Sequence, residues 1–257
     1  DKLAREHSLT SDEYGVLIES ATPSLADYAA AAADKLRRKY YGTDVYIRGL
    51  IEVGNICRND CLYCGIRASN KHCDRYLLTE EQIAECCREG YRLGFRTFVL
   101  QGGEGAFPID AVCSVVSEIR KSYQDCAITL SPGEYPRDDY KRMFDSGADR
   151  YLLRHETADK DHYKKLHPSS MSFENRRRCL YDLRDIGFQV GCGFMVGSPF
   201  QTVETLVKDL KFIEEFKPDM CGIGPFIPHK DTPFYGYPPG SASLTVFLLS
   251  LIRLIKP

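Results

Sequence analysis

The sequence predicts an α/β fold in which a parallel sheet curves into a TIM-type barrel. Short apolar runs with strand character alternate six times with amphipathic helical segments. Several of these helices begin at a capping residue or end at a glycine. Strand–helix alternation requires right-handed crossovers and therefore a parallel sheet. A complete barrel of this type has eight units. Six are visible here, so the count alone does not decide between a six-unit partial barrel and a full eight-unit barrel.

The individual elements follow from hydrophobic period and from capping and glycine signals. The expected strands are residues 44–53, 96–101, 127–131, 150–156, 189–196 and 220–226. The expected helices are residues 79–93, 108–121, 136–146, 172–186, 202–216 and 243–255. In the fourth strand, Arg150, Leu152, Arg154 and Glu156 should share one face, because side chains alternate with period two.

The first 43 residues have a different pattern. Residues 9–39 read as helical, with a cap at Thr10 or Ser11, an alanine-rich second half and several basic residues at the end. We therefore divide the chain into an N-terminal helical extension, residues 1–43, and a barrel, residues 44–257.

Composition excludes several classes of partner. The 257 residues include 34 Lys and Arg against 36 Asp and Glu, so there is no basic excess for nucleic acid. No apolar stretch approaches the length of a membrane span, and no secretory segment is visible. With 11 cysteines in a chain of this kind, we expect a reducing, cytoplasmic location.

Three of the cysteines are closely spaced. Cys57, Cys61 and Cys64 follow the first strand with the pattern C-x3-C-x2-C. Thiolates are soft ligands that suit iron–sulfur clusters and zinc. Three of them can hold three irons of a 4Fe–4S cube and leave the fourth iron free for a small molecule. Zinc is the alternative, with Cys73 or His72 as a fourth ligand, but no second close pair of cysteines is present.

The aromatic residue before the last cysteine, Tyr63, completes a C-x3-C-x-Φ-C motif that resembles the radical S-adenosylmethionine (SAM) superfamily. The resemblance implies a 4Fe–4S cluster whose open iron chelates the amino and carboxylate groups of SAM. An electron from the cluster then cleaves SAM and releases a 5′-deoxyadenosyl radical.

Further candidate residues lie after the carboxyl ends of strands, where function gathers in such barrels. Gly102, Gly103 and Glu104 follow the second strand and resemble the superfamily's GGE motif, which contacts the amino group of SAM. Arg154 and Glu156 end the fourth strand, where charges that are buried need a partner or a ligand. An internal ion pair between these two residues is the alternative.

Five more positions are candidates on weaker signals. Arg176 lies on the apolar stripe of its helix and could pair with the carboxylate of SAM, whereas a solvated basic patch with Arg177 and Arg178 is the alternative. Met195 and Ile223 end glycine-rich strands that suit an adenine and its ribose, with core packing as the equal alternative. Thr129 ends the third strand and could face substrate. His229 could ligate a metal or simply be exposed.

Five longer strings together resemble the HydE family of FeFe-hydrogenase maturases, in the biotin synthase and methylornithine synthase branch. They are Tyr46–Glu52, Leu100–Glu104, Tyr151–Thr157, Ser172–Arg176 and Gly222–His229. This resemblance implies a full (βα)8 barrel, which we expect to be truncated here before strands seven and eight. It also implies SAM contacts at Glu104, Glu156 and Arg176, and a substrate pocket reached by Arg154 and Thr129. It implies assembly of the hydrogenase diiron subcluster, with a cysteine-bound iron carbonyl cyanide unit as substrate. Transient contacts with other maturases and with an electron donor are expected.

Two alternatives stay open. One is another radical SAM enzyme of the same branch, such as a methylornithine synthase-like mutase or a biotin synthase-like enzyme. A biotin synthase would need a second cluster, for which no cysteine set is visible. The other is a non-catalytic iron–sulfur or zinc protein, which would not cleave SAM.

Overall fold

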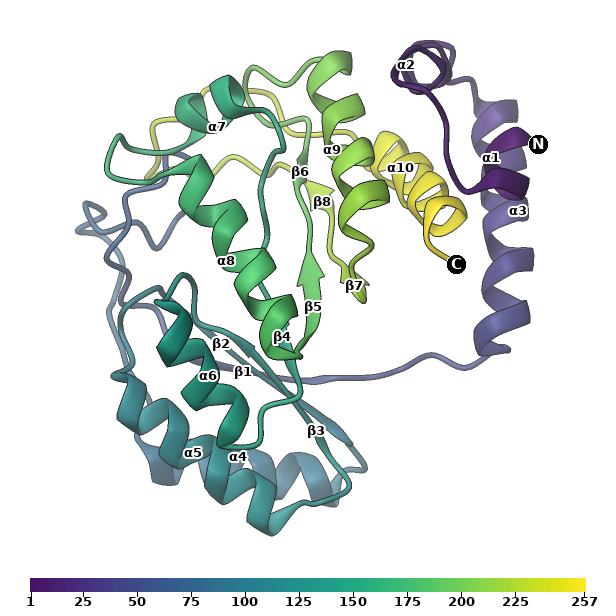
Figure 1. Ribbon diagram of the computed structural model, residues 1–257. Coiled ribbons are helices and arrows are strands. Elements are labelled where there is room, and N and C mark those ends of the chain that lie inside the picture. Colours follow the sequence, from purple (N-terminus) through teal and green to yellow (C-terminus); the bar gives the residue numbers. More distant parts are fainter.

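The computed structural model describes all residues 1–257 and contains a six-stranded parallel sheet with the order β1-β2-β3-β4-β5-β7 (Figure 1). The predicted α/β class with a parallel sheet is confirmed. The sheet is open, with β1 and β7 at its edges. The strands are β1 (Gly49–Gly54), β2 (Thr97–Gly102), β3 (Ala127–Ser131), β4 (Arg150–Leu152), β5 (Gln189–Cys192), β6 (Met195–Val196), β7 (Met220–Cys221) and β8 (Gly224–Pro225).

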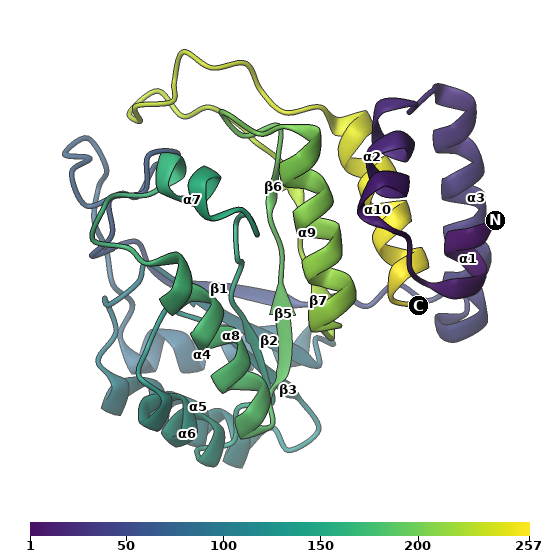
Figure 2. The same cartoon turned by 45° about the horizontal axis from the view of Figure 1, so that its top comes forward.

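Five helices that connect these strands, α4, α5, α6, α8 and α9, cover one side of the sheet (Figures 1 and 2). Their bounds agree with the predicted segments to within about two residues. Two short helices, α1 and α7, were not predicted. The helices are α1 (Lys2–Glu6), α2 (Ser11–Glu19), α3 (Pro23–Tyr41), α4 (Glu80–Arg92), α5 (Ile109–Ser122), α6 (Arg137–Asp145), α7 (Lys160–Leu166), α8 (Phe173–Ile186), α9 (Val203–Phe216) and α10 (Ala242–Ile255). None of them is long and apolar enough to span a bilayer.

The first predicted strand begins too early. Residues 44–48 are not a strand, and Val45 and Ile47 are 83% and 70% exposed. Pairing with β2 starts only at Gly49, opposite Phe98. Because a strand needs a neighbour to accept its backbone hydrogen bonds, apolar alternation alone extended the prediction too far.

The fifth and sixth predicted strands are each divided in two. Beyond Cys192, β6 pairs with β8 in a separate two-stranded sheet. At the break, a Cβ atom on Gly193 would lie 1.9 Å from the carbonyl oxygen of Gly222. Only glycine allows the two chains to approach this closely, and the strands change direction there.

The fourth strand ends at Leu152, so the prediction that residues 150–156 share one alternating face is wrong beyond that point. Glu156 has a φ of 64°, in the left-handed region that a carboxylate residue seldom occupies. This turn in the backbone, rather than strand periodicity, sets the direction of the Glu156 side chain.

The main hydrophobic core lies between the sheet and its helices. Alternate residues such as Phe98, Leu100, Ile128 and Leu130 are buried in it. The alternating positions between them point to the opposite face, which carries polar groups. There Gln101 of β2 donates to Glu52 of β1 at 3.0 Å. On β3, Thr129 and Ser131 lie on the same face, in register with Val99 and Gln101 of β2. Polar side chains therefore line part of this face, together with the apolar Val99.

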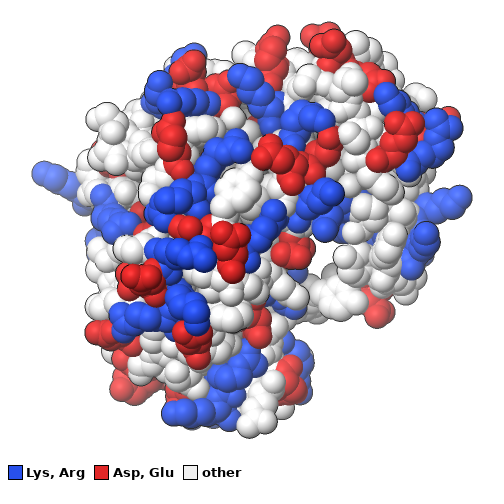
Figure 3. All heavy atoms as spheres, viewed as in Figure 1, with Lys and Arg blue, Asp and Glu red and all other residues white.

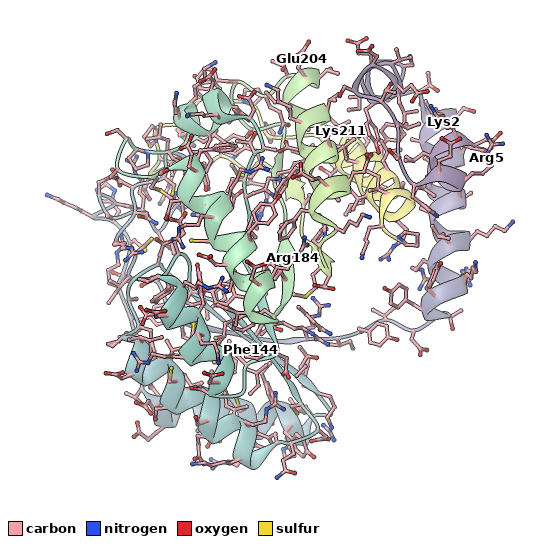
Figure 4. The ribbon with its side chains drawn as sticks, viewed as in Figure 1. Lys2, Arg5, Phe144, Arg184, Glu204 and Lys211 are labelled. Atoms are coloured by element: carbon pink, nitrogen blue, oxygen red, sulfur yellow. The ribbon has the colours of Figure 1, made fainter.

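The N-terminal helices pack against the far end of the molecule. Helix α3 lies along α10 and helix α2 along α9 (Figure 2). The hydroxyl of Tyr14 donates to Glu214 at 2.9 Å, and Lys211, which is labelled in Figure 4, donates to the carbonyl of Leu9 at 3.1 Å. These contacts join the first 41 residues to α9 and α10. The boundary at residue 43 stays a prediction.

Candidate active site

The three closely spaced cysteines lie in the loop after β1, at the carboxyl edge of the sheet. All three are free thiols of intermediate burial. Burial, and then the neighbouring thiol of Cys64, raises the pKa of Cys61 to about 12, so a thiolate at this position requires a compensating cation. No three His, Cys, Asp or Glu side chains converge as ligands of a single metal ion. Three reduced thiols on one loop instead fit a larger, four-iron cluster with one open iron.

The loop after β2 is pressed against the cysteine loop. A Cβ atom on Gly103 would lie 2.0 Å from the carbonyl oxygen of Ile56 and 3.0 Å from Cβ of Cys57. Only glycine fits at such a distance. The backbone N–H of Arg58 donates to the carbonyl of Glu104 at 2.9 Å. The Gly102–Glu104 motif therefore lies beside the first cysteine, and its contact with SAM stays a prediction.

Glu104 is buried and is paired with two arginines. Its carboxylate accepts from the Arg58 guanidinium at 2.9 Å and lies 3.9 Å from Nη2 of Arg176. Arg58, directly after the first cysteine, was not identified from the sequence. It holds Glu104 on the side of the cysteine loop, so the carboxylate is fixed between that loop and α8.

Arg176 is 8% exposed, so the solvated-patch alternative is wrong for this residue. Its Nε donates to Glu134 at 2.5 Å and its Nη1 donates to the carbonyl of Arg154 at 3.1 Å. Arg177 and Arg178 are more exposed and pair with Glu215 and Asp182. Figure 3 shows Lys and Arg interspersed with Asp and Glu over this face of the molecule.

Glu134 was missed by the sequence analysis. It lies in the loop after β3 and is 8% exposed. Its backbone carbonyl accepts from Arg58 at 2.8 Å, and its carboxylate binds Arg176 and Asn175. A carboxylate just past the end of the third strand is the same signal that identified Glu104 and Glu156, and it could have been found in that way.

Several buried polar atoms in β3 and in the segment after β4 have no hydrogen-bond partner. Buried atoms with no hydrogen bond include Thr129 Oγ1, Arg154 Nε, Arg154 Nη2 and Glu156 Oε2. The Arg154 and Glu156 side chains approach to 3.6 Å, so the predicted ion pair is present but is not a hydrogen bond. Leaving a buried polar group unpaired costs about 1–3 kcal/mol. Such a set indicates a polar ligand at this place.

The two apolar candidates differ in their surroundings. Met195 belongs to a small buried cluster with Leu166, Phe226 and Phe234, against which Tyr63 packs. Ile223 is partly buried and packs against the main core. Met195 therefore lies near the cysteine loop, whereas for Ile223 the packing alternative describes what the structure shows.

His229 packs against the residue that follows the third cysteine. A Cβ atom on Gly65 would lie 2.8 Å from its ring. The His229 Nδ1 accepts from the backbone N–H of Asp231 at 3.1 Å. No set of metal ligands forms around His229. Its ring instead packs against the cysteine loop at Gly65.

The structure combines a parallel α/β sheet with three thiols and buried ion pairs at its carboxyl edge. This combination is typical of iron–sulfur enzymes with a barrel-type fold. The sequence profile of the Radical SAM superfamily matches residues 51–213, and the chain belongs to that superfamily. The predicted superfamily is confirmed.

Individual relatives narrow the comparison. The chain is 48% identical over 226 residues to the [FeFe] hydrogenase maturase subunit HydE of Thermotoga maritima. This match covers 88% of this chain and 64% of that protein. It is 25% identical to the 3-methylornithine synthase of Methanosarcina acetivorans, with 100% of this chain and 73% of the relative covered. The chain thus spans about two thirds of the length of these proteins.

Solved structures agree with this assignment of the fold. The crystal structure of methylornithine synthase (PylB) superposes with a TM-score of 0.89 at 25% identity, covering 100% of this chain and 77% of that one. The hydrogenase maturase HydG superposes with a TM-score of 0.83 at 22% identity, covering 98% and 59% of the two chains, which shows a shared fold.

Proposed function

We propose that this radical SAM enzyme acts in maturation of an FeFe-hydrogenase, as its HydE relative is named to do. The observation that carries the proposal is a set of buried polar atoms without hydrogen bonds, on Thr129 of β3 and on Arg154 and Glu156 after β4, in a chain with three free thiols on the loop after β1. The 48% identity to HydE supports the particular role.

In this proposal Cys57, Cys61 and Cys64 hold a 4Fe–4S cluster, and SAM binds beside it. When bound, the cluster supplies one electron that cleaves SAM to a 5′-deoxyadenosyl radical. Glu104 and the backbone of Gly102 and Gly103 bind the amino group of SAM, since a buried carboxylate and backbone carbonyls both accept from an ammonium. The charge pairs of Glu104 with Arg58 and Arg176 hold its carboxylate in one position before SAM arrives.

Arg176 takes the carboxylate of SAM. Two of its five N–H donors are used by Glu134 and by the carbonyl of Arg154, so donors remain for an anion. Glu156 presents an unpartnered Oε2 that accepts from a ribose hydroxyl. Tyr63 and Met195 supply the apolar surface for the adenine.

Arg154 and Thr129 bind the substrate. Nε and Nη2 of Arg154 make no hydrogen bond and can donate to an anionic or strongly polar group, and the Thr129 hydroxyl can donate or accept. A cysteine-bound iron carbonyl cyanide unit is a small organometallic substrate of this kind. The role further implies a cytoplasmic location and transient contacts with an electron donor and with the other maturases.

A mutase of the methylornithine synthase type is the second candidate. The whole chain aligns with such an enzyme, and the TM-score of 0.89 supports it. The two candidates share their cofactors and differ in substrate, so product analysis separates them.

The test is anaerobic reconstitution with iron and sulfide, followed by EPR of the reduced cluster with and without SAM and measurement of 5′-deoxyadenosine. We expect a SAM-dependent change of the spectrum and release of 5′-deoxyadenosine, both lost in Cys61→Ala. A cluster whose spectrum ignores SAM, in this chain and in a longer version that includes further strands, would contradict the proposal.

A further inference from the structure

Tyr63, between the second and third cysteines, is held by a histidine from another part of the chain. Its hydroxyl lies 3.0 Å from Nε2 of His167. The opposite ring nitrogen, Nδ1, lies 2.9 Å from the carbonyl oxygen of Tyr163. Because a carbonyl can only accept, Nδ1 carries the proton and Nε2 is left to accept from the Tyr63 hydroxyl. The two hydrogen bonds together assign one tautomer to His167.

Contacts other than the one with Tyr63 already hold the His167 ring in place. It is 3% exposed and stacks on the ring of Tyr163, with 3.9 Å between the ring centroids. The backbone N–H of His167 also donates to the Tyr163 carbonyl, at 3.1 Å. Pro168 follows, and the restriction that proline places on the preceding residue ends α7 at this point. Backbone and ring therefore hold His167 in one orientation.

The same segment contacts the cysteine loop at two other points. The backbone N–H of Leu62 donates to the carbonyl of Leu166 at 3.0 Å. The sulfur of Cys61 lies 3.6 Å from the sulfur of Met171. Both residues that separate Cys61 from Cys64 are thus bound to the end of α7, one through its backbone and the other through its side chain.

We propose that His167 is a positioning residue for the cluster-binding segment, acting through the hydroxyl of Tyr63. It holds Leu62 and Tyr63 so that the thiols on either side are presented in a fixed arrangement before a cluster is bound. The inference rests on the proposed function in one respect, namely that Cys61 and Cys64 bind the cluster. Preorganised ligands lose less freedom when the metal group binds, and they release it more slowly.

Packing of the Tyr63 ring alone is the competing explanation. Tyr63 already lies against the cluster formed by Leu166, Met195, Phe226 and Phe234. If packing were sufficient, a phenylalanine at position 63 would hold the segment equally well. The hydroxyl and the His167 nitrogen would then contribute nothing to the thiols.

The experiment compares Tyr63→Phe, His167→Phe, the double variant and His167→Gln with the unchanged chain. The first readout is the reaction rate of Cys61 and Cys64 with iodoacetamide in the protein without a cluster, followed by mass spectrometry. The second is the rate at which reconstituted protein loses iron to a chelator. A single hydrogen bond corresponds to about two- to ten-fold in such rates, and we expect both rates to rise by that factor in each single variant.

The double variant tests whether the two side chains act together. If they act through one hydrogen bond, its rates equal those of either single variant. His167→Gln offers an amide oxygen to the Tyr63 hydroxyl and should restore part of the effect, but only when Tyr63 is present. Tyr14→Phe is the matched control. It removes a hydroxyl of α2 that donates to Glu214 of α9 at 2.9 Å, far along the chain from the cysteine loop, and it should leave both rates unchanged.

Rates that stay at the level of the unchanged chain in Tyr63→Phe and His167→Phe, or that multiply in the double variant, would overturn the inference. Failure of the proposed function has a different signature. In that case the chain takes up no cluster that responds to SAM, while the alkylation rates still report whether His167 holds the segment.

Discussion

Arg176 and Glu134 form a buried ion pair, with Nε and Oε1 2.5 Å apart and each residue 8% exposed. The pair joins α8 to the loop after β3. A second carboxylate, Glu104, lies 3.9 Å from the same guanidinium, and Arg58 pairs with that carboxylate from the cysteine loop. Two arginines and two carboxylates thus connect three loops and one helix at the carboxyl edge of the sheet.

Removing Arg176 should therefore destabilise the protein before any effect on chemistry is considered. Arg176→Ala leaves Glu134 buried without its cation, and breaking a buried pair in this way costs about 3–5 kcal/mol. Chemical denaturation of the protein without a cluster measures the loss. Arg178→Ala is the control, because Arg178 pairs with Asp182 at the surface with 46% of its side chain exposed, and it should change stability by less than about 0.5 kcal/mol. Equal losses in the two variants would show that the buried pair has no special role.

The second prediction concerns the contact between the two loops that carry Cys57 and Glu104. Gly103→Ala places a Cβ atom 2.0 Å from the Ile56 carbonyl oxygen, so the loops must separate. We expect a loss of about 1–3 kcal/mol in unfolding free energy and a lower iron content after reconstitution. Gly236→Ala is the matched control, since nothing lies within 4 Å of its Cβ position. Normal stability and full iron loading in Gly103→Ala would contradict the close approach.

Local signals in the sequence predicted the helices well, because capping and periodicity act over a few residues. A capping box at Thr79, in which Thr79 and Gln82 each bond the other's backbone, starts α4 within a residue of the predicted position. Cysteine spacing likewise predicted which loop carries the thiols. The strand bounds that were predicted wrongly have a different origin. The break after Cys192 depends on the approach of Gly193 to Gly222, a contact across 29 residues of sequence separation that periodicity cannot express.

In the candidate site, too, local sequence pattern identified some residues and missed those that act through contacts between loops. Arg176 was assigned to the inward face of its helix by period alone, and the structure buries it. Glu134 carried a usable signal in its place after the third strand, whereas His167 was not identified because its role depends on a contact between loops. His167 meets Tyr63 only after α7 has formed and ended at Pro168. Pairings of this kind depend on how loops fold against one another, which local propensity does not determine.

The third prediction uses the unpartnered hydroxyl of Thr129. Thr129 is 2% exposed and its Oγ1 has no hydrogen bond. Thr129→Val has nearly the same shape and removes the unsatisfied group, so the protein without ligands should be equally stable or more stable by up to about 1–3 kcal/mol. If the hydroxyl binds substrate, turnover falls at the same time while SAM binding is kept. Thermal unfolding and an assay for product in the presence of substrate measure the two effects, and a fall in stability would mean that the hydroxyl already has a partner.

The last prediction concerns acid stability. Burial lowers the pKa of His167 from its usual value to about 3, and the nearby Arg176 cation acts in the same direction. The neutral imidazole is therefore kept in the folded protein, while the unfolded chain takes up a proton below about pH 6.5. Because the unfolded state binds more protons, the stability contributed by this group is present above about pH 6.5 and is lost as the pH falls toward 3.

His167→Gln removes this titrating group and leaves an acceptor for Tyr63. Between pH 6.5 and 4, the unfolding free energy of the unchanged chain should fall more steeply than that of the variant, by up to about 1.4 kcal/mol per pH unit. His162, whose pKa burial also lowers, contributes to both proteins equally and cancels in the comparison. Urea unfolding of the protein without a cluster at a series of pH values gives the two slopes. Parallel slopes would mean that His167 takes up a proton in the folded state, and its Nε2 would then no longer accept from Tyr63.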